Sequence, residues 1–172
     1  MATRVPQRQL AAWRALLGAH AAVVTRVEQE LAAAGLPPLA WYDLLWAIRE
    51  SPQRRARLGE LAAQLTISRG GMTKLVDRLE DAGLVRREPA PDDRRGSYAV
   101  LTAAGARMLK RMWPTYSAVL AEAVGPLRAS DAETARRVLR EIEARATPTP
   151  ARATRARRAE FAALGSSSRK SS

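Results

Sequence analysis

Residues 58–83 read LGELAAQLTISRGGMTKLVDRLEDAG, and this stretch holds two short helical segments separated by the tripeptide TIS. The first segment, LGELAAQL, is long enough for about two helical turns. The second begins at Ser68, a favoured N-cap residue, and ends at Gly83, a favoured C-terminal stop. One face of the second helix is apolar, through Met72, Leu75, Val76 and Leu79. Two short helices joined by so tight a turn predict a helix-turn-helix.

A charged β-hairpin is predicted directly after the second helix. The runs LVRRE (84–88) and SYAVLT (97–102) are strand-like, and the segment PAPDDRRG lies between them. We expect this segment to be a loop, with Arg94 and Arg95 at its tip and Gly96 permitting a tight turn. A helix-turn-helix followed by such a hairpin forms a winged helix, the hairpin being the wing.

Helices are also predicted before the winged helix. An alternating spacing of three and four residues gives a first helix, about 8–34, a coiled-coil-like seam of Leu10, Trp13, Leu17, His20, Val24, Val27 and Leu31. Gly35 with Pro37 and Pro38 ends this helix. The next helix, 39–50, is apolar nearly all round, so we expect it to be buried.

Further helices follow the hairpin. Residues 102–124 regain a helical period, and a last helix is predicted over 131–145 with Ser130 as its N-cap. Its inward face is expected to consist of Ala135, Val138, Leu139 and Ile142. The predicted fold class is therefore mainly α with a small β-hairpin wing.

The composition excludes several kinds of chemistry. The 172-residue chain has no cysteine and one histidine, so thiolate metal sites, disulfides and a histidine-based catalytic triad are not expected. We therefore expect no enzyme, no metal and no cofactor. No segment approaches the roughly 20 apolar residues of a membrane helix, and the N-terminus lacks the apolar core of a signal peptide. We expect a soluble cytoplasmic protein with no membrane partner.

The charge favours a polyanionic partner. Lysine and arginine number 29 against 17 aspartate and glutamate, a balance of +12. Residues 147–172 carry +5 of this and contain two prolines and a serine run, so we expect a basic, disordered tail. The remaining +7 lies on residues 1–146. An arginine-rich composition also arises in GC-rich genomes, but a surplus this large on a small chain is typical of nucleic-acid binding.

Residues 58–105 resemble the DNA-binding core of the MarR family of bacterial transcriptional regulators. The resemblance rests on VDRLEDAGLVRR (76–87) and on the wing pattern D-x-R followed by L-T-x-x-G, and the helical layout extends it to about 8–146. One departure is Thr66, where glycine is common in helix-turn-helix turns. The resemblance implies an obligate homodimer whose dimerisation layer is formed by helices about 8–34 and 102–146. Two winged helices, about 39–101 in each chain, then bind a near-palindromic operator in double-stranded DNA.

The expected DNA contacts come from the second helix and the wing. In the second helix they are Ser68, Arg69, Gly70, Thr73, Lys74 and Arg78, and in the wing Asp93, Arg94, Arg95 and Gly96. The resemblance implies that Arg95 enters the minor groove, and Asp93 can hold this arginine by a charge-assisted hydrogen bond. The alternative to a DNA contact is that Lys74 and Arg78 lie on a solvated helix face and pair with Asp77 or Asp81.

Ligand sensing is also implied by the resemblance, because family members bind a small, often aromatic or phenolic, anion between the dimerisation layer and the winged helix. The candidate effector pocket consists of Trp13, His20, Trp41, Tyr42, Asp43 and Trp46. The alternative is that these aromatic residues form core and that His20 lies in the dimer interface.

Taken together, these features predict a sequence-specific, homodimeric repressor, released by a ligand and associated with the nucleoid of a bacterial cell. The alternative is an architectural nucleoid protein with low sequence preference.

Overall fold

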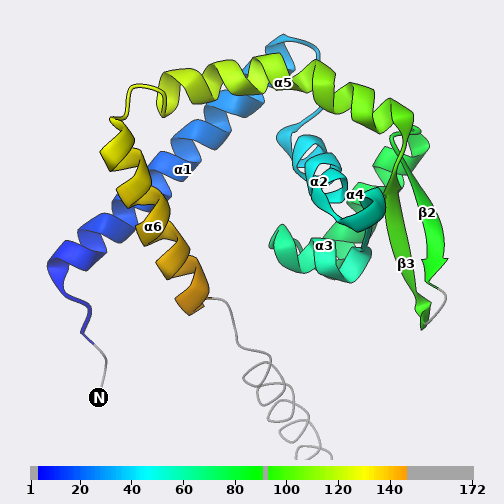
Figure 1. Ribbon diagram of the computed structural model, residues 1–172, viewed down its shortest axis with the longest axis horizontal. Coiled ribbons are helices and arrows are strands. Elements are labelled where there is room, and N and C mark those ends of the chain that lie inside the picture. The colour runs from blue at the N-terminus through cyan, green and yellow to red at the C-terminus, as the bar shows by residue number, and fades with distance from the viewer. Residues whose placement is uncertain (1–3, 91–92, 147–172) are drawn as a thin grey trace, which may run out of the picture. The chain divides into compact units, whose positions relative to one another are not determined.

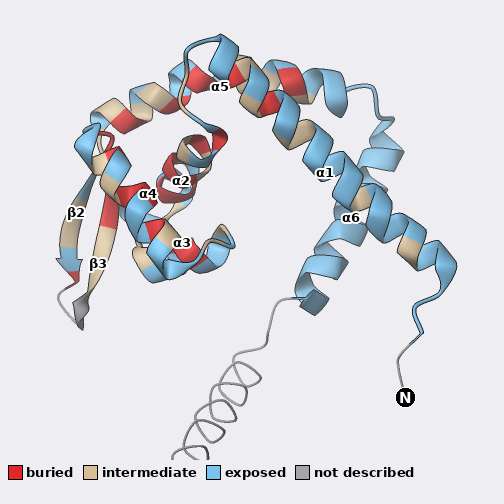
Figure 2. Ribbon diagram, turned by 180° about the vertical axis from the view of Figure 1, so that it is seen from behind, coloured by how far each residue is buried: buried red, intermediate tan, exposed pale blue. Residues whose placement is uncertain are grey.

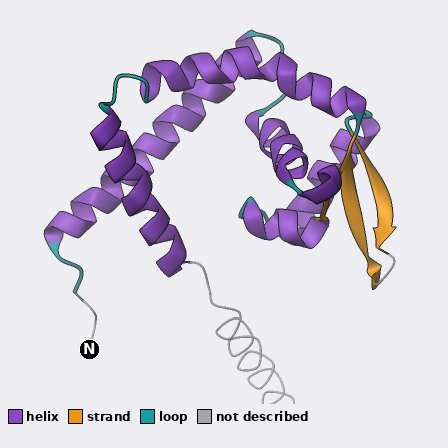
Figure 3. Cartoon of the chain, viewed as in Figure 1, coloured by secondary structure: helices purple, strands orange, loops and turns teal. Residues whose placement is uncertain are grey.

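The computed structural model describes residues 4–90 and 93–146, apart from the side chains of 93–95. The chain divides between Gly125 and Pro126 into two compact units. Figures 1 and 3 show the elements of the first unit and, in the second, helix α6. In chain order they are α1 (Gln7–Ala33), α2 (Leu39–Glu50), the 3-10 turn η1 (Pro52–Arg54), β1 (Arg55–Arg57), α3 (Leu58–Gln64), α4 (Arg69–Asp81), β2 (Val85–Ala90), β3 (Asp93–Leu101), α5 (Ala103–Ala123) and α6 (Ala129–Ala146).

The fold is mainly helical with one small antiparallel sheet, in the order β1-β3-β2. Strand β1 was not predicted. It places Arg55 opposite Val100 and Arg57 opposite Tyr98, and between them Ala56 is buried. A strand of three residues with arginine at two of them carries too little apolar alternation to be detected from sequence.

The wing differs from the prediction. Instead of a loop over 89–96, β2 continues to Ala90 and β3 begins at Asp93, so Arg94, Arg95 and Gly96 lie in a strand and not at the tip of a loop. The ladder is irregular there, because the pair Pro89–Ser97 is followed by Ala90–Asp93. Backbone pairing does not need apolar side chains, which is why the composition of the charged run suggested a loop where the strands continue.

The helix-turn-helix is confirmed. The side chain of Ser68 accepts a hydrogen bond from the Gly71 N–H at 3.1 Å and so caps α4. The turn is made by Thr66, whose φ of 55° is left-handed although threonine adopts this conformation at a cost. After α4, Gly83 adopts a φ of 69°, and the N–H of Leu84 bonds to the Leu79 carbonyl at 2.8 Å, which ends the helix.

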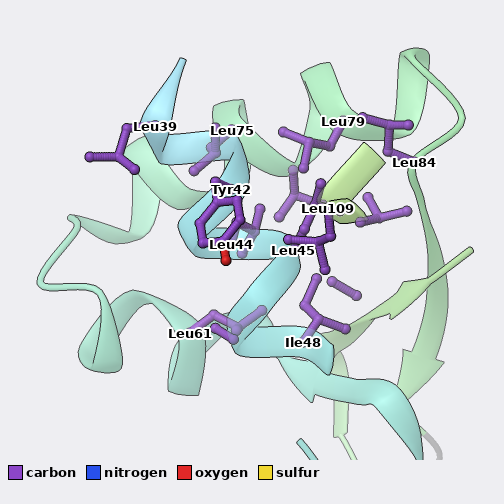
Figure 4. Packing of buried hydrophobic residues seen from close by; sticks show 14 of the residues in the cluster. Leu39, Tyr42, Leu44, Leu45, Ile48, Leu61, Leu75, Leu79, Leu84 and Leu109 are labelled. Carbon is purple, nitrogen blue, oxygen red and sulfur yellow. The ribbon is translucent and has the colours of Figure 1, made fainter. Parts of the chain in front are cut away.

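The hydrophobic core lies in the first unit and centres on α2 (Figure 4). Leu44, Leu45 and Ile48 of α2 are fully buried, and the predicted apolar face of α4 packs into the same cluster. The predicted burial of α2 is confirmed for Leu39, Leu44, Leu45 and Ile48, whereas Trp41 is only partly buried and Trp46 is 40% exposed.

The L-T-x-x-G pattern joins the core to α5. Thr102 caps α5 by accepting the Gly105 N–H at 3.0 Å, and its hydroxyl lies 2.9 Å from the Leu84 carbonyl oxygen. Gly105 packs against the same carbonyl so closely that a Cβ atom would collide with it. The threonine and the glycine thereby fix the start of α5 against the end of the helix-turn-helix.

The last helix differs from the prediction at its start and on its apolar face. Helix α6 begins at Ala129, so Ser130 lies inside the helix instead of capping it. Every residue of α6 is exposed (Figure 2), including the face expected to be inward, Ala135, Val138, Leu139 and Ile142. The expected tail, 147–172, lies outside the described residues. Within the described part of the chain, no helix combines the length and apolarity needed to cross a membrane.

Candidate nucleic-acid interface

Helix α4 presents a cationic, solvent-exposed face. All six residues predicted to contact DNA from this helix are exposed: Ser68, Arg69, Gly70, Thr73, Lys74 and Arg78. Among the described residues, Arg69, Lys74 and Arg78 form no ion pair. The alternative in which Lys74 and Arg78 pair with Asp77 or Asp81 is therefore wrong for this structure. Unpaired cations on an exposed helix face are suited to bind polyanions.

The acidic residues of α4 are instead engaged by Arg87 of β2. Its Nη2 lies 2.6 Å from Asp77 Oδ1 and its Nη1 lies 3.5 Å from Glu80 Oε2. The Arg87 backbone N–H also donates to Glu80 Oε1 at 2.8 Å, and Nη2 donates to the Thr73 carbonyl at 3.3 Å. One arginine thus connects the wing to α4 and neutralises the acidic charge beside it. The sequence did not predict this role, because a cross-element ion pair leaves no periodic signal.

The start of α4 leaves room for close approach of its backbone. A Cβ atom at Gly70 would meet nothing within 4 Å, so the protein's own packing does not require glycine there. A Cβ atom at Gly71, in contrast, would lie 3.0 Å from Ile67 Cγ2. Gly71 is thus explained by packing within the chain, whereas Gly70 is available for approach by a partner.

The wing residues lie on β3 next to the hairpin end. The side chains of Asp93, Arg94 and Arg95 fall outside the described residues, so the contact between Asp93 and Arg95 and the minor-groove role of Arg95 stay predictions. Gly96 is partly buried in the strand. These residues lie on β3, the central strand of the sheet, between β1 and β2. Arg87 of β2 connects this sheet to α4 through its ion pair with Asp77.

Comparisons with known proteins agree with this arrangement. The MarR family model matches residues 34–96, which cover the helix-turn-helix and most of the wing. The HTH-type transcriptional regulator MhqR of Bacillus subtilis (strain 168) is 24% identical over 138 residues, which cover 79% of this chain and 92% of that protein. Sco3205, a MarR family transcriptional regulator from Streptomyces coelicolor solved in complex with DNA, has a TM-score of 0.77 and 29% identity, covering 87% of this chain and 94% of that one. The chain is similar to MarR family transcriptional regulators in the sequence of its winged helix and in its fold.

A second similar solved structure is that of CouR from Rhodococcus jostii RHA1, bound to p-coumaroyl-CoA. Its TM-score is 0.66 at 25% identity, covering 78% of this chain and 90% of that one. Across the described residues, no group of three or more histidine, aspartate and glutamate side chains is arranged to hold a metal ion.

The six candidate effector residues do not form one pocket. Two hollows adjoin the rings of Tyr42 and Tyr116, whose centroids are 4.6 Å apart and whose planes are tilted by 32°. The first, the acidic hollow, has a volume of about 400 Å³ and is lined by the candidates His20 and Asp43, with Tyr116 and apolar residues of α1. The second, the basic hollow, measures about 310 Å³ and is lined by the candidates Tyr42 and Trp46, with Arg49, Leu109, Lys110 and Trp113.

The remaining two candidates lie elsewhere. Trp41 is partly buried and packs against the core, whereas Trp13 is 51% exposed on α1. The prediction from sequence missed Arg49, Lys110 and Trp113, of which the latter two lie on α5. Only the packing of α5 against α2 brings them beside Trp46.

The two hollows have opposite electrostatic character. Burial raises the pKa of Asp43 in the acidic hollow, and the nearby Glu28 raises it further. The Asp43 carboxyl makes no hydrogen bond or ion pair within the described part of the chain. In the basic hollow, the Arg49 guanidinium lies 5.1 Å from the Trp46 ring centroid, and neither Arg49 nor Lys110 has an acidic partner among the described residues. An anion is therefore favoured in the basic hollow and disfavoured in the acidic one.

Proposed function

We propose that this protein is a sequence-specific DNA-binding transcriptional regulator that acts as a homodimeric repressor and is released by a small aromatic anion. The observation that carries the DNA-binding function is the exposed face of α4, where Arg69, Lys74 and Arg78 have no acidic partner in the described part of the chain while Arg87 engages Asp77 and Glu80. The DNA complex of the similar Sco3205 supports this proposal. The N-terminal part of α4 would lie in the major groove, where Lys74 and Arg78 reach base edges.

The homodimer is supported by apolar surface that the single chain leaves exposed. Trp13 and Leu17 of α1 are 51% and 49% exposed, and Leu139 and Ile142 of α6 are exposed as well. Such clusters of large apolar side chains are unusual on monomeric proteins. A second copy of the chain would cover them, and a two-fold dimer would present two recognition helices to a near-palindromic operator.

The effector is assigned to the basic hollow. Trp46 and Trp113 are 40% and 48% exposed and provide aromatic surface, while Arg49 and Lys110 provide positive charge that no described acidic residue neutralises. This combination suits an aromatic carboxylate or phenolate. The hollow joins α2, which belongs to the DNA-binding core, to α5. A ligand that changes the spacing of these helices would therefore change the position of α4, and release from DNA would follow.

DNA binding is tested with the double variant Lys74→Ala/Arg78→Ala. We expect the preference for the operator over random DNA to fall by roughly 1–3 kcal/mol for each side chain that no longer reaches a base edge. Arg111→Ala, an exposed arginine on α5, is the control and should retain the preference. The measurement is a binding titration with labelled operator and competitor DNA. Equal wild-type affinity for operator and random DNA would favour an architectural protein over a regulator.

The effector site is tested by tryptophan fluorescence with pairs of ligands that share an aromatic ring and differ in charge. Aromatic carboxylates should quench the wild type and lower its operator affinity, and operator should in turn weaken their binding, because coupling between two ligands is reciprocal. Lys110→Ala should weaken carboxylate binding, whereas Asp43→Asn in the acidic hollow should not. Unchanged carboxylate binding by Lys110→Ala would rule out the basic hollow as the site.

A further inference from the structure

A third hollow lies between α3, α4 and the wing sheet. It has a volume of about 480 Å³, and its lining includes Arg57, Arg69, Thr73, Arg87, Gly96 and Ser97. Three arginines and no acidic residue line it within the described part of the chain. The lining combines the first turns of α4 with β3, the two elements to which DNA contact is assigned above. We call it the arginine hollow.

Arg57 is held in position at one wall of this hollow by Tyr98. Strand pairing places the two residues opposite each other on β1 and β3. The Arg57 Nε donates a hydrogen bond to the Tyr98 hydroxyl at 3.2 Å, and the guanidinium carbon lies 5.2 Å from the ring centroid. Arg55 also lies over this ring, at 4.9 Å. A guanidinium ordered by an aromatic ring loses less conformational entropy when it binds an anion.

The other two arginines contribute differently to the charge of the hollow. Arg87 is largely neutralised by Asp77 and Glu80. Arg69, the first residue of α4, is exposed and has no acidic partner among the described residues. Arg69 therefore gives the hollow a positive charge that no described acidic residue neutralises.

We propose that the arginine hollow binds one backbone phosphate of the operator DNA, with Arg57 of β1 as a DNA-contacting residue beside Arg69. This inference rests on the proposed DNA-binding function and adds a contact outside the recognition helix and the wing tip. A duplex that lies against α4 and β3 brings its phosphates to the space between them. Phosphate contacts set the register of a protein on DNA without reading sequence, so Arg57 would anchor the orientation of α4.

The test compares Arg57→Ala with wild type in titrations with operator and with random DNA at several salt concentrations. We expect affinity to fall roughly tenfold on both DNAs, and the slope of log affinity against log salt to fall by about 1, as when one phosphate is no longer neutralised by the protein. Arg57→Lys should keep the slope, because it keeps the charge. Arg86→Ala is the matched control, since Arg86 is an exposed arginine of β2 that pairs with Glu88 and does not line the hollow.

Two outcomes overturn the proposal. The first is an unchanged salt slope for Arg57→Ala while operator binding persists. The second is a loss confined to the operator, which would make Arg57 a base reader. If Arg57→Ala lowers the melting temperature strongly, Tyr98→Phe replaces it: this variant removes only the hydroxyl that orients Arg57, and we expect a two- to threefold loss on both DNAs with the slope retained. No loss for that variant would overturn the positioning by Tyr98. Failure of the proposed function is distinct, because wild type itself would then show no operator preference.

Discussion

The two halves of helix α1 have the same sequence pattern and opposite surroundings. In the C-terminal half, Val27 and Leu31 are 1% and 0% exposed, and the helix packs there against α5 and α2. The N-terminal half is largely exposed (Figure 2), and Trp13 and Leu17 on the same seam are 51% and 49% exposed. The seam therefore consists of a part that the chain covers itself and a part that it leaves open. Hydrophobic periodicity shows which face of a helix needs cover but not what covers it.

The largest expected effect comes from placing a charge in each half. Val27→Asp buries a carboxylate without a partner, so we expect a loss of about 4 kcal/mol or more in the free energy of unfolding and a largely unfolded protein. Leu17→Asp should leave the helical circular dichroism spectrum intact but dissociate the dimer and abolish tight operator binding. Sedimentation measures the second effect, as a change to the mass of one 18.8 kDa chain.

The burial of Val27 also shows that the seam from Leu10 to Leu31 is not one continuous dimer interface. Val27 belongs to the core of the single chain, so its replacement cannot report on dimerisation alone. A Leu17→Asp variant that sediments as a dimer would show that the exposed half of α1 is not the interface. A Val27→Asp variant with the melting temperature of wild type would show that the buried half is not essential to the core.

A smaller effect is expected from replacing one buried and one exposed glycine with alanine. Gly105→Ala places a Cβ atom against the Leu84 carbonyl and 2.8 Å from Leu101 Cδ1, so we expect a loss of roughly 2–3 kcal/mol of stability. Gly18→Ala in the open half of α1 meets nothing within 4 Å in the single chain, and alanine is the better helix former by about 1 kcal/mol. Chemical denaturation should show a lower free energy of unfolding for Gly105→Ala and a higher one for Gly18→Ala.

The Gly18 result also probes the dimer. A gain in stability means that this part of α1 has space around it in the assembled protein. A loss means that a partner chain lies close to the Gly18 backbone. Gly105→Ala has no such ambiguity, because its contacts are all within one chain, and a neutral outcome there would contradict the packing of α5 against the end of the helix-turn-helix.

Sequence predicted best those elements whose signals are local. The bounds of α2, the N-cap Ser68 and the apolar face of α4 all follow from capping chemistry and helical spacing, which act within a few residues. Strand β1 was missed because its pairing strand, β3, lies about 40 residues away in sequence. The loop expected over 89–96 was wrong because strand pairing extended through charged residues.

The candidate site shows the same division. The cationic face of α4 could be predicted from the sequence, since one helix carries all of it. Arg57, Arg87 and Lys110 could not, because each gains its role from a residue on another element: Tyr98, Asp77 and Trp46 respectively. The candidates His20 and Tyr42 were grouped because both lie on helices that the resemblance implies line one crevice, but the packed helices place them in separate hollows.

The smallest expected effect concerns Asp43, at the place where the two halves of α1 meet. The acidic hollow is lined by His20 from the open half and by Val27 from the buried half, and Asp43 faces it from α2. Burial raises the pKa of Asp43 above its unfolded value, and Glu28 adds to the rise. The folded protein therefore binds this proton more tightly than the unfolded chain, so ionisation of Asp43 lowers stability as the pH rises through the folded pKa.

Asp43→Asn removes this cost without changing the shape of the side chain. We expect the variant to be slightly more stable than wild type at pH 7. The difference should shrink as the pH falls through the raised pKa of Asp43 and vanish once this carboxyl is protonated in both the folded and the unfolded chain. Denaturation midpoints at several pH values measure the difference.

The double variant Leu17→Asp/Asp43→Asn is the control for this prediction. In a dissociated chain, no partner chain can cover the acidic hollow. If partner cover contributes to the burial of Asp43, the gain from Asp43→Asn will be smaller in the Leu17→Asp background than in the dimer. An equal gain in both backgrounds would mean that the single chain alone buries Asp43, and that the boundary between the covered and open halves of α1 lies on the N-terminal side of this hollow.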